Sequence, residues 1–176
     1  EGQEDPYFFG TIILDCSDPE GKKLDLIDGQ QRTTSFLILL KALQLKIAES
    51  LQEIDNPKNQ RDPSIKGTRR GLQRVYDDIM GILYKADSKS LVYIEDDWNN
   101  AKGITIIKNN SINELYKNDL VNLIEAKDYD EALRSATIIK YKRKDNKYTN
   151  FFKNFKFFYS KLGKNRRDSW LLGFAE

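Results

Sequence analysis

The sequence predicts an α+β protein in which a small mixed β-sheet comes first and a mainly helical region follows. Two observations lead to this class. Residues 7–14 are rich in aromatic and β-branched side chains, which favour a β-strand. From Gln31 onward, apolar side chains recur every three or four residues, which is the spacing of an amphipathic helix. The length of 176 residues suits one domain, or one and a half, with a core of its own.

Two strands are expected at the start of the chain, over residues 7–14 and 23–27. Pro19 and Gly21 lie between them and favour a turn, so the pair is expected to form an antiparallel hairpin with a long loop. Because Glu1 stands so close to the first strand, we expect the sheet to be incomplete at its N-terminus.

A long helix is predicted over residues 31–54. Its buried face is expected to be the apolar stripe formed by Phe36, Leu40, Leu43, Ile47 and Leu51. Polar side chains fall between these positions and are expected to face solvent; they are Lys41, Gln44, Lys46 and Glu49.

Helices joined by polar loops are expected in the remaining chain. The helical segments are residues 72–83, a segment that starts at a capping box of Ser111 and Glu114, and residues 129–139 and 148–162. Short strands are expected over residues 91–95 and 104–107, and loops over residues 55–66 and 140–147. The chain is therefore divided into a sheet-bearing core over residues 1–55 and a mainly helical remainder over residues 56–176.

The composition excludes several classes of site. The chain has no His, so it holds no Ser-His-Asp triad, no His-ligated zinc and no His-Asn-His nuclease. It has neither a P-loop nor a Rossmann glycine motif. Its one cysteine, Cys16, excludes an internal disulfide, and the acidic groups at Asp77-Asp78 and 95–97 suit a solvated surface better than a metal site. No apolar run approaches the roughly 18 residues that cross a membrane, and no signal peptide is found, so a cytoplasmic protein is expected.

Charge is distributed unevenly, although its net value is only +2. Residues 1–133 hold 17 basic and 24 acidic side chains, whereas residues 134–167 hold 12 basic side chains and one acidic one. The basic segment suits phosphate neutralisation, and it equally suits a solvated face that balances the acidic part. Its aromatic residues have helical spacing and are expected in the core. The nucleic-acid contacts expected here are Lys140, Lys142, Arg143, Lys144, Lys147, Arg166 and Arg167.

The junction of the second strand and the first helix, Asp-Gly-Gln-Gln-Arg-Thr-Thr from Asp28 onward, is the most informative stretch. Gly29 allows a sharp turn, and the first amides of the helix form an anion site together with the positive end of its dipole. Arg32 can grip a phosphate with two hydrogen bonds, and Thr33 and Thr34 add hydroxyl donors. Asp28 is placed to hold Mg²⁺, accept a ribose hydroxyl or orient a water. An ordinary capped helix would use the same residue types.

The strand YFFGTIIL, followed by IDGQQRTT and an apolar helix, resembles the N-terminal domain of GmrSD-type restriction endonucleases. That family shows a similar strand and then IDGQQRLTTL before a leucine-rich helix, and the close likeness covers residues 7–47. Thr33 stands where the family has Leu, and the family's upstream IPxYQRxYxW-like segment is absent here.

This resemblance implies a ParB/sulfiredoxin-like core whose DGQQR turn binds a nucleoside triphosphate. The implied nucleotide site consists of Asp28, Gly29, Gln30, Gln31 and Arg32, with Thr33 and Thr34 as further donors. Asp28, Gln31 and Arg32 are the catalytic residues expected for hydrolysis of the nucleotide. Mg²⁺ is the metal ion expected to bind together with the nucleotide. The family acts in prokaryotic defence by cutting modified phage DNA, so the expected partners are DNA and a nuclease domain or subunit outside this chain.

The sequence leaves two other functions open. In one, the chain is a non-catalytic DNA-binding module whose DGQQR turn grips a backbone phosphate; DNA binding that ignores nucleotide and Arg32 would favour it. In the other, the chain is a protein-interaction scaffold with a vestigial pocket, which would bind neither nucleotide nor DNA.

Overall fold

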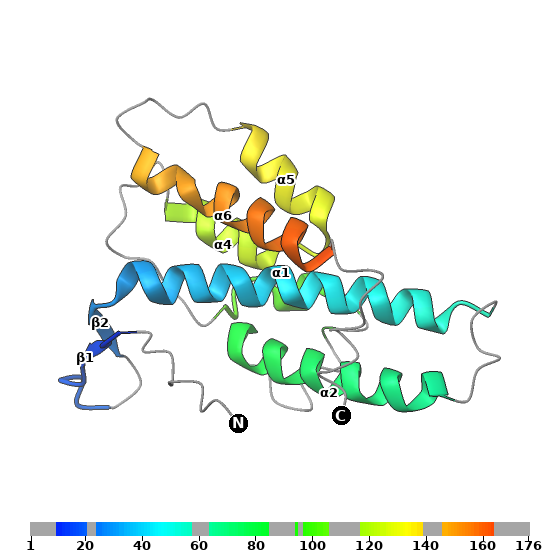
Figure 1. The fold of residues 1–176 in the computed structure, drawn as a ribbon. Coiled ribbons are helices and arrows are strands. Elements are labelled where there is room, and N and C mark those ends of the chain that lie inside the picture. Colours follow the sequence, from blue (N-terminus) through cyan, green and yellow to red (C-terminus); the bar gives the residue numbers. More distant parts are fainter. Residues whose placement is uncertain are drawn as a thin grey trace, which may run out of the picture. The chain divides into compact units, whose positions relative to one another are not determined.

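The computed structural model of the chain describes residues 10–20, 24–57, 64–84, 94, 97–105, 117–138 and 146–163 (Figure 1). Strands come first and helices follow, which confirms the predicted α+β class. The elements are, in chain order, β1 (Ile13–Asp15), β2 (Asp25–Asp28), α1 (Gln30–Asp55), α2 (Ser64–Tyr84), the 3-10 helix η1 (Trp98–Ala101), α4 (Lys117–Glu125), α5 (Tyr129–Ile138) and α6 (Asn146–Gly163).

The backbone falls into two compact units, residues 1–37 and 38–176. Helix α1 begins in the first unit and continues in the second, so its residues 30–37 belong with the strands. The functional division at residue 55 stays a prediction, as does a ParB/sulfiredoxin-like identity for the sheet. Among the described helices, none has a stretch both long and apolar enough to cross a bilayer.

The N-terminal unit is built around an antiparallel hairpin, as predicted. β1 pairs with β2 through Leu14 opposite Leu26, and the pairing is irregular between Ile13 and Leu14. The described strands have three and four residues, and residues 7–9 and 21–23 lie outside the described part. Most apolar side chains of this two-stranded ribbon are exposed, with 62% of Ile27 accessible, whereas Leu26 is half-buried.

Helix α1 agrees with the predicted helix, but its buried face is wider than one stripe. Leu40, Ile47 and Leu51 are buried as predicted, whereas Phe36 is 45% exposed and Leu43 is half-buried. The prediction that Lys41 and Gln44 face solvent is wrong, because both are fully buried. The reason is that α1 contacts helices on several sides: the side chain of Lys41 reaches α2 and the end of α4, and that of Lys46 reaches α6 (Figure 1).

The other helices agree with the predicted pattern, with shifted ends. α2 begins at Ser64, inside the predicted loop 55–66, and α6 begins at Asn146, inside the predicted loop 140–147. The start expected at Ser111 lies outside the described residues, and the described part of that helix is α4.

The two short strands predicted further along the chain are compared with the structure one at a time. Of residues 91–95 only Ile94 is described, and its backbone is helical, so a strand there is wrong. Ile94 is 2% exposed, so it belongs to the core although its β-branched side chain favours a strand. Of residues 104–107, Ile104 and Thr105 are described and have no regular structure.

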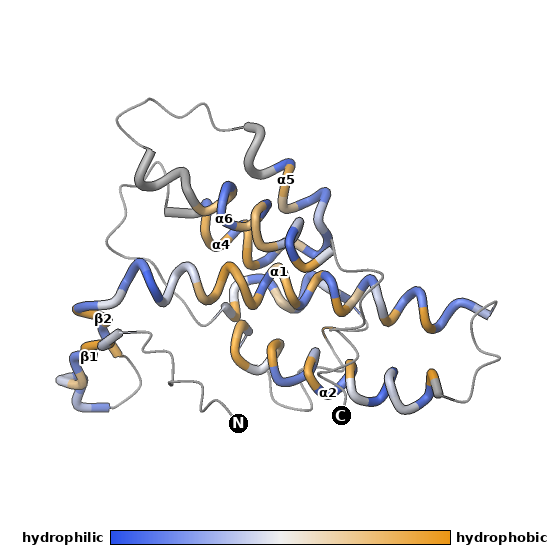
Figure 2. The backbone as a smooth tube through the Cα atoms, viewed as in Figure 1, coloured by the Kyte–Doolittle hydropathy of each residue, from blue (hydrophilic) through white to orange (hydrophobic). Residues whose placement is uncertain are grey.

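The core of the C-terminal unit lies where the apolar sides of these helices meet. Figure 2 shows apolar and polar positions alternating along α1 and α2, in step with the helical turn. Leu72 and Leu83 of α2 and Leu123 of α4 are buried. Phe152 and Phe155 of α6 are buried as well, which confirms that these two aromatic side chains belong to the core.

Candidate functional site

The turn between β2 and α1 needs a glycine at position 29. Gly29 is buried and has φ +89°, a conformation that L side chains rarely adopt. A Cβ added there would lie 3.2 Å from Cγ1 of Ile12 and 3.3 Å from the carbonyl oxygen of Thr11. The carbonyl of Gly29 accepts the first helical hydrogen bond, from the amide of Thr33 at 2.9 Å. The glycine thus lets the chain turn sharply against β1 and start the helix at once.

The first turn of α1 presents backbone donors to an open cavity. The amides of Gln30, Gln31 and Arg32 precede the first helical hydrogen bond, so they have no partner within the helix. The first turn itself has no acidic side chain, and the carboxylate of Asp28 lies two residues before it. A cavity of about 320 Å³ lies beside the turn; its lining residues are Ile27, Asp28, Gly29, Gln30, Gln31 and Arg32. Its donors and its dipole suit an anionic ligand.

Arg32 is held in place by the first strand region. Its Nη2 donates a hydrogen bond to the carbonyl oxygen of Thr11, and lies 3.6 Å from Oδ2 of Asp28. Gly10, at φ +100°, makes room for it, because a Cβ at Gly10 would come within 2.7 Å of Nη1 of Arg32. The Nε of Arg32 is buried and has no hydrogen-bond partner among the described residues. The guanidinium is therefore positioned by packing, by its bond to Thr11 and by its ion pair with Asp28, and among the described residues its Nε keeps an unused donor.

The two glutamines of the motif differ in their contacts. The side-chain amide of Gln30 donates to the carbonyl of Leu26 at 3.1 Å, which ties it back to β2. Gln31 is exposed, lines the cavity and has no side-chain partner within the described ranges. Of the two, Gln31 is the one whose amide is available to a ligand or a water.

The structure brings five of the seven predicted nucleotide-site residues to one cavity, namely those from Asp28 to Arg32. Thr33 and Thr34 are half-buried and are not among its lining residues. The hydroxyl of Thr33 is buried without a partner in the described part of the chain.

Asp28 is the one carboxylate among the cavity's lining residues, and its side chain is 62% exposed. No group of three or more His, Cys, Asp or Glu side chains that would suit a metal occurs among the described residues. Mg²⁺ is commonly bound by one or two carboxylates together with substrate phosphates and water. Asp28 fits that mode of binding and does not fit a site made of protein ligands alone.

The predicted nucleic-acid contacts are not described by the structure. Lys140, Lys142, Arg143 and Lys144 lie outside the described residues, as do Arg166 and Arg167. Lys147 lies in α6, but the structure does not describe its side chain.

Sequence reasoning missed a polar cluster around the fully buried Lys41. Its Nζ donates to Oε1 of Gln44 and to the hydroxyl of Tyr84, both at 2.9 Å, and to the carbonyl of Ala126. The hydroxyl of Tyr84 donates to the carbonyl of Ile124, just before the end of α4. Burial lowers the pKa of Lys41 well below its usual value, and the charges of Glu131 and Asp128 offset part of this effect.

This cluster satisfies the carbonyls at the C-terminal end of α4, so its first role is structural. The indole of Trp98 completes it by donating to the carbonyl of Glu125 at 2.7 Å, and the Nζ of Lys41 lies 4.9 Å from the centre of that ring. One signal in the sequence could have revealed it. Lys41 interrupts the apolar run from Phe36 to Leu45, where a solvent-facing lysine is out of place.

A comparison of sequences gives the family. The model of the family described as "GmrSD restriction endonuclease, N-terminal domain" matches residues 3–174, which is nearly the whole chain. No curated protein and no solved structure is significantly similar to the chain. The family match covers both compact units and includes the turn that lines the cavity. The chain therefore belongs to the family of N-terminal domains of GmrSD restriction endonucleases.

Proposed function

We propose that this chain binds and hydrolyses a nucleoside triphosphate as part of a restriction system that defends against phage DNA. The observation that carries the proposal is the turn at Gly29, where residues whose amides have no partner within the helix, together with Arg32, line one cavity of about 320 Å³. Backbone amides at a helix start and an arginine are the groups that proteins use to hold phosphates.

In this proposal each residue has one task. The amides of the first turn and Arg32 neutralise the phosphate charge, which increases on the leaving oxygen as the bond breaks. Asp28 would hold a Mg²⁺ ion, which would supply further neutralisation of the phosphate charge. Gln31 orients the attacking water, since Gln30 is tied to Leu26. Water adds to the terminal phosphorus, the bond to the bridging oxygen breaks, and the products are a nucleoside diphosphate and inorganic phosphate.

The DNA partner and the nuclease belong to the same proposal. The family description supports a role in restriction, and a chain without His needs a nuclease domain or subunit elsewhere to cut DNA by His-Asn-His chemistry. We place DNA cleavage in that nuclease and nucleotide turnover in this chain.

The test is calorimetry of the full chain with Mg²⁺ and a panel of nucleoside triphosphates, followed by measurement of phosphate release. Arg32→Ala is expected to weaken nucleotide binding by at least about 10-fold, because a hydrogen bond to a charged group contributes about 1.5–3 kcal/mol. Gln31→Ala is expected to slow phosphate release while leaving binding within about threefold. Arg134→Ala removes an exposed arginine of α5 and serves as the matched control.

Two results would contradict the proposal. The first is nucleotide binding that Arg32→Ala leaves unchanged. The second is the absence of nucleotide binding combined with salt-dependent DNA binding, which would favour the non-catalytic DNA-binding alternative.

A further inference from the structure

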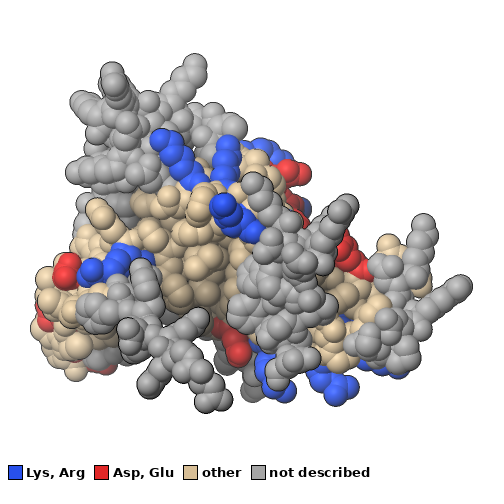
Figure 3. All heavy atoms as spheres, in the orientation of Figure 1, with Lys and Arg blue, Asp and Glu red and all other residues tan. Residues whose placement is uncertain are grey.

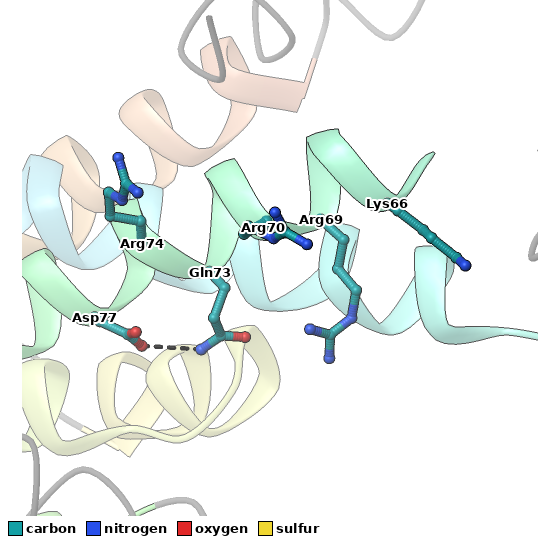
Figure 4. A pocket seen from close by; sticks show the side chains of 6 residues that line it. All are labelled: Lys66, Arg69, Arg70, Gln73, Arg74 and Asp77. Atoms are coloured by element: carbon teal, nitrogen blue, oxygen red, sulfur yellow. Dashed lines mark hydrogen bonds between the residues drawn. The ribbon is translucent and has the colours of Figure 1, made fainter. Parts of the chain in front are cut away.

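A second cavity lies on helix α2, within the C-terminal unit and apart from the DGQQR turn in the chain. Its volume is about 500 Å³, and its lining residues are Lys66, Arg69, Arg70, Gln73, Arg74 and Asp77 (Figure 4). Lys66, Arg70 and Arg74 are four residues apart, so they follow one row along the helix surface, and all three are exposed. We call this row of three cations the α2 row.

The polar neighbours of the α2 row already have partners. Arg69 is fixed by two hydrogen bonds to the carboxylate of Asp55 at the end of α1, at 2.6 and 3.0 Å. Gln73 donates to Asp77 at 2.9 Å, the bond drawn in Figure 4. By contrast, no member of the α2 row forms an ion pair with any other residue that the structure describes. The positive charges of the α2 row are therefore available to bind an external anion.

The position of the row on the helix strengthens its field. Lys66 lies in the first turn of α2, at the positive end of the helix dipole, and no acidic side chain offsets it there. A cation at this end is slightly unfavourable for the helix itself, so Lys66 does not stabilise α2 through the helix dipole. The surface beside the row is open, because a Cβ added at Gly67 would meet no atom within 4 Å.

We propose that the α2 row binds the phosphate backbone of double-stranded DNA. From Lys66 to Arg74 the helix rises by about 12 Å, and over that length B-DNA presents about seven phosphates. Figure 3 shows the Lys and Arg side chains in separate groups on the viewed face, one of them at the lower edge, where α2 lies. A short row of exposed cations matches a regular polyanion and gives affinity without reading the bases.

This inference rests on the proposed function in one respect, which is that DNA is the polymer on which the restriction system acts. It does not depend on the nucleotide site. It also differs from the nucleic-acid contacts predicted from the sequence, which all lie between Lys140 and Arg167. The row ends at the acidic pair Asp77-Asp78, which repels phosphate and limits the contact to the N-terminal half of α2.

The test compares two double variants of the full chain that remove the same charge. Arg70→Gln with Arg74→Gln removes two members of the α2 row, and Lys102→Gln with Lys127→Gln removes two exposed lysines elsewhere in the C-terminal unit. Binding of a short fluorescent DNA duplex is followed by anisotropy between about 50 and 200 mM salt. Circular dichroism checks that both variants keep the helical content of the original chain.

The α2 variant is expected to lower the slope of log affinity against log salt by about 1.8, because each neutralised phosphate contributes about 0.9. Affinities are compared relative to those at 1 M salt. On this scale, each phosphate that the variant no longer neutralises is expected to lower its affinity at 0.1 M salt by about 8-fold. The lysine control is expected to change the slope by less than about half a unit, and Arg70→Lys with Arg74→Lys to keep the original slope, because the charge is kept.

Equal decreases in slope and affinity in the α2 variant and in the lysine control would overturn the inference, because only net charge would then matter. An unchanged salt slope in the α2 variant would also overturn it. The same holds if the affinity decreases only for an RNA duplex or for anionic vesicles offered in place of DNA. If the unaltered chain binds no DNA at low salt, both the inference and the DNA part of the proposed function fall. Nucleotide binding that depends on Arg32 would still stand in that case.

Discussion

Replacing the buried Lys41 by methionine tests the polar cluster at the end of α4. Lys41→Met keeps a long unbranched side chain and removes all of its donors. The carbonyl of Ala126 and the side-chain oxygen of Gln44 then lose their bond to Nζ in a fully buried place. An unsatisfied buried acceptor costs about 1–3 kcal/mol, so the lost bonds are expected to lower the free energy of unfolding by about 2–4 kcal/mol at pH 9. At pH 7 the decrease is expected to be smaller, because methionine also removes the cost of burying the lysine charge.

The same substitution should alter how stability depends on pH. Because burial lowers the pKa of Lys41, the unfolded chain still holds this proton at pH values where the folded protein has released it. The unfolded state then binds more protons, so stability rises with pH between the lowered pKa and the ordinary value of about 10.4. One proton gives at most about 1.4 kcal/mol per pH unit, and Lys41→Met removes this rise.

Urea unfolding followed by circular dichroism, at pH values from about 7 to 9, measures both effects. The upper limit avoids the range in which Tyr84 acts, since burial raises the pKa of its hydroxyl and favours ionisation of the unfolded chain above about pH 10. Lys102→Met, at an exposed position, is the control and should stay within about 0.5 kcal/mol. A Lys41→Met variant as stable as the original chain at pH 9 would refute the reasoning. A variant that keeps the original pH slope would refute the assignment of that slope to Lys41.

Two glycine substitutions give further predictions. Gly10→Ala is expected to weaken nucleotide binding in the manner of Arg32→Ala, because the new Cβ would displace the guanidinium, which lies within 2.7 Å; calorimetry measures this. Gly103→Ala is the control for backbone strain, because Gly103 also has a positive φ but has open space around it. Equally weakened nucleotide binding in both variants would disprove a positioning role for Gly10. Gly67→Ala is expected to stabilise the chain by about 0.5–1 kcal/mol, seen as a higher melting temperature, because alanine favours the helix and the added methyl meets nothing.

The order of elements followed from local patterns. The strand-rich start, the break at Gly29 and the apolar spacing of the helices are all properties of neighbouring residues. The pattern was less reliable where contacts between distant segments decide the outcome. Ile94 lies in a stretch with β-branched residues, but it is helical and buried within the mainly helical unit.

The candidate site also has parts that follow from neighbouring residues and parts that depend on contacts between distant segments. The residues from Asp28 to Arg32 were predicted as one group because they adjoin in the chain, and they do line one cavity. That Gly10 makes room for Arg32 was not predicted, because the two are far apart in the sequence and meet only when β1 pairs with β2. The α2 row was not predicted either, because the densest run of charge lies elsewhere in the sequence and exposure along a helix depends on what packs against it.

By itself, the sequence determined that a strand meets a helix at a glycine, that helices dominate the rest, and that no His-dependent chemistry operates in this chain. These properties depend on residue type and on spacing between near neighbours. Only the tertiary structure decided that Lys41 and Gln44 are buried and that Lys66, Arg70 and Arg74 are exposed. A helix contacted on several sides buries polar positions that a single apolar stripe assigns to solvent, so the burial of a charge depends on its neighbours in space.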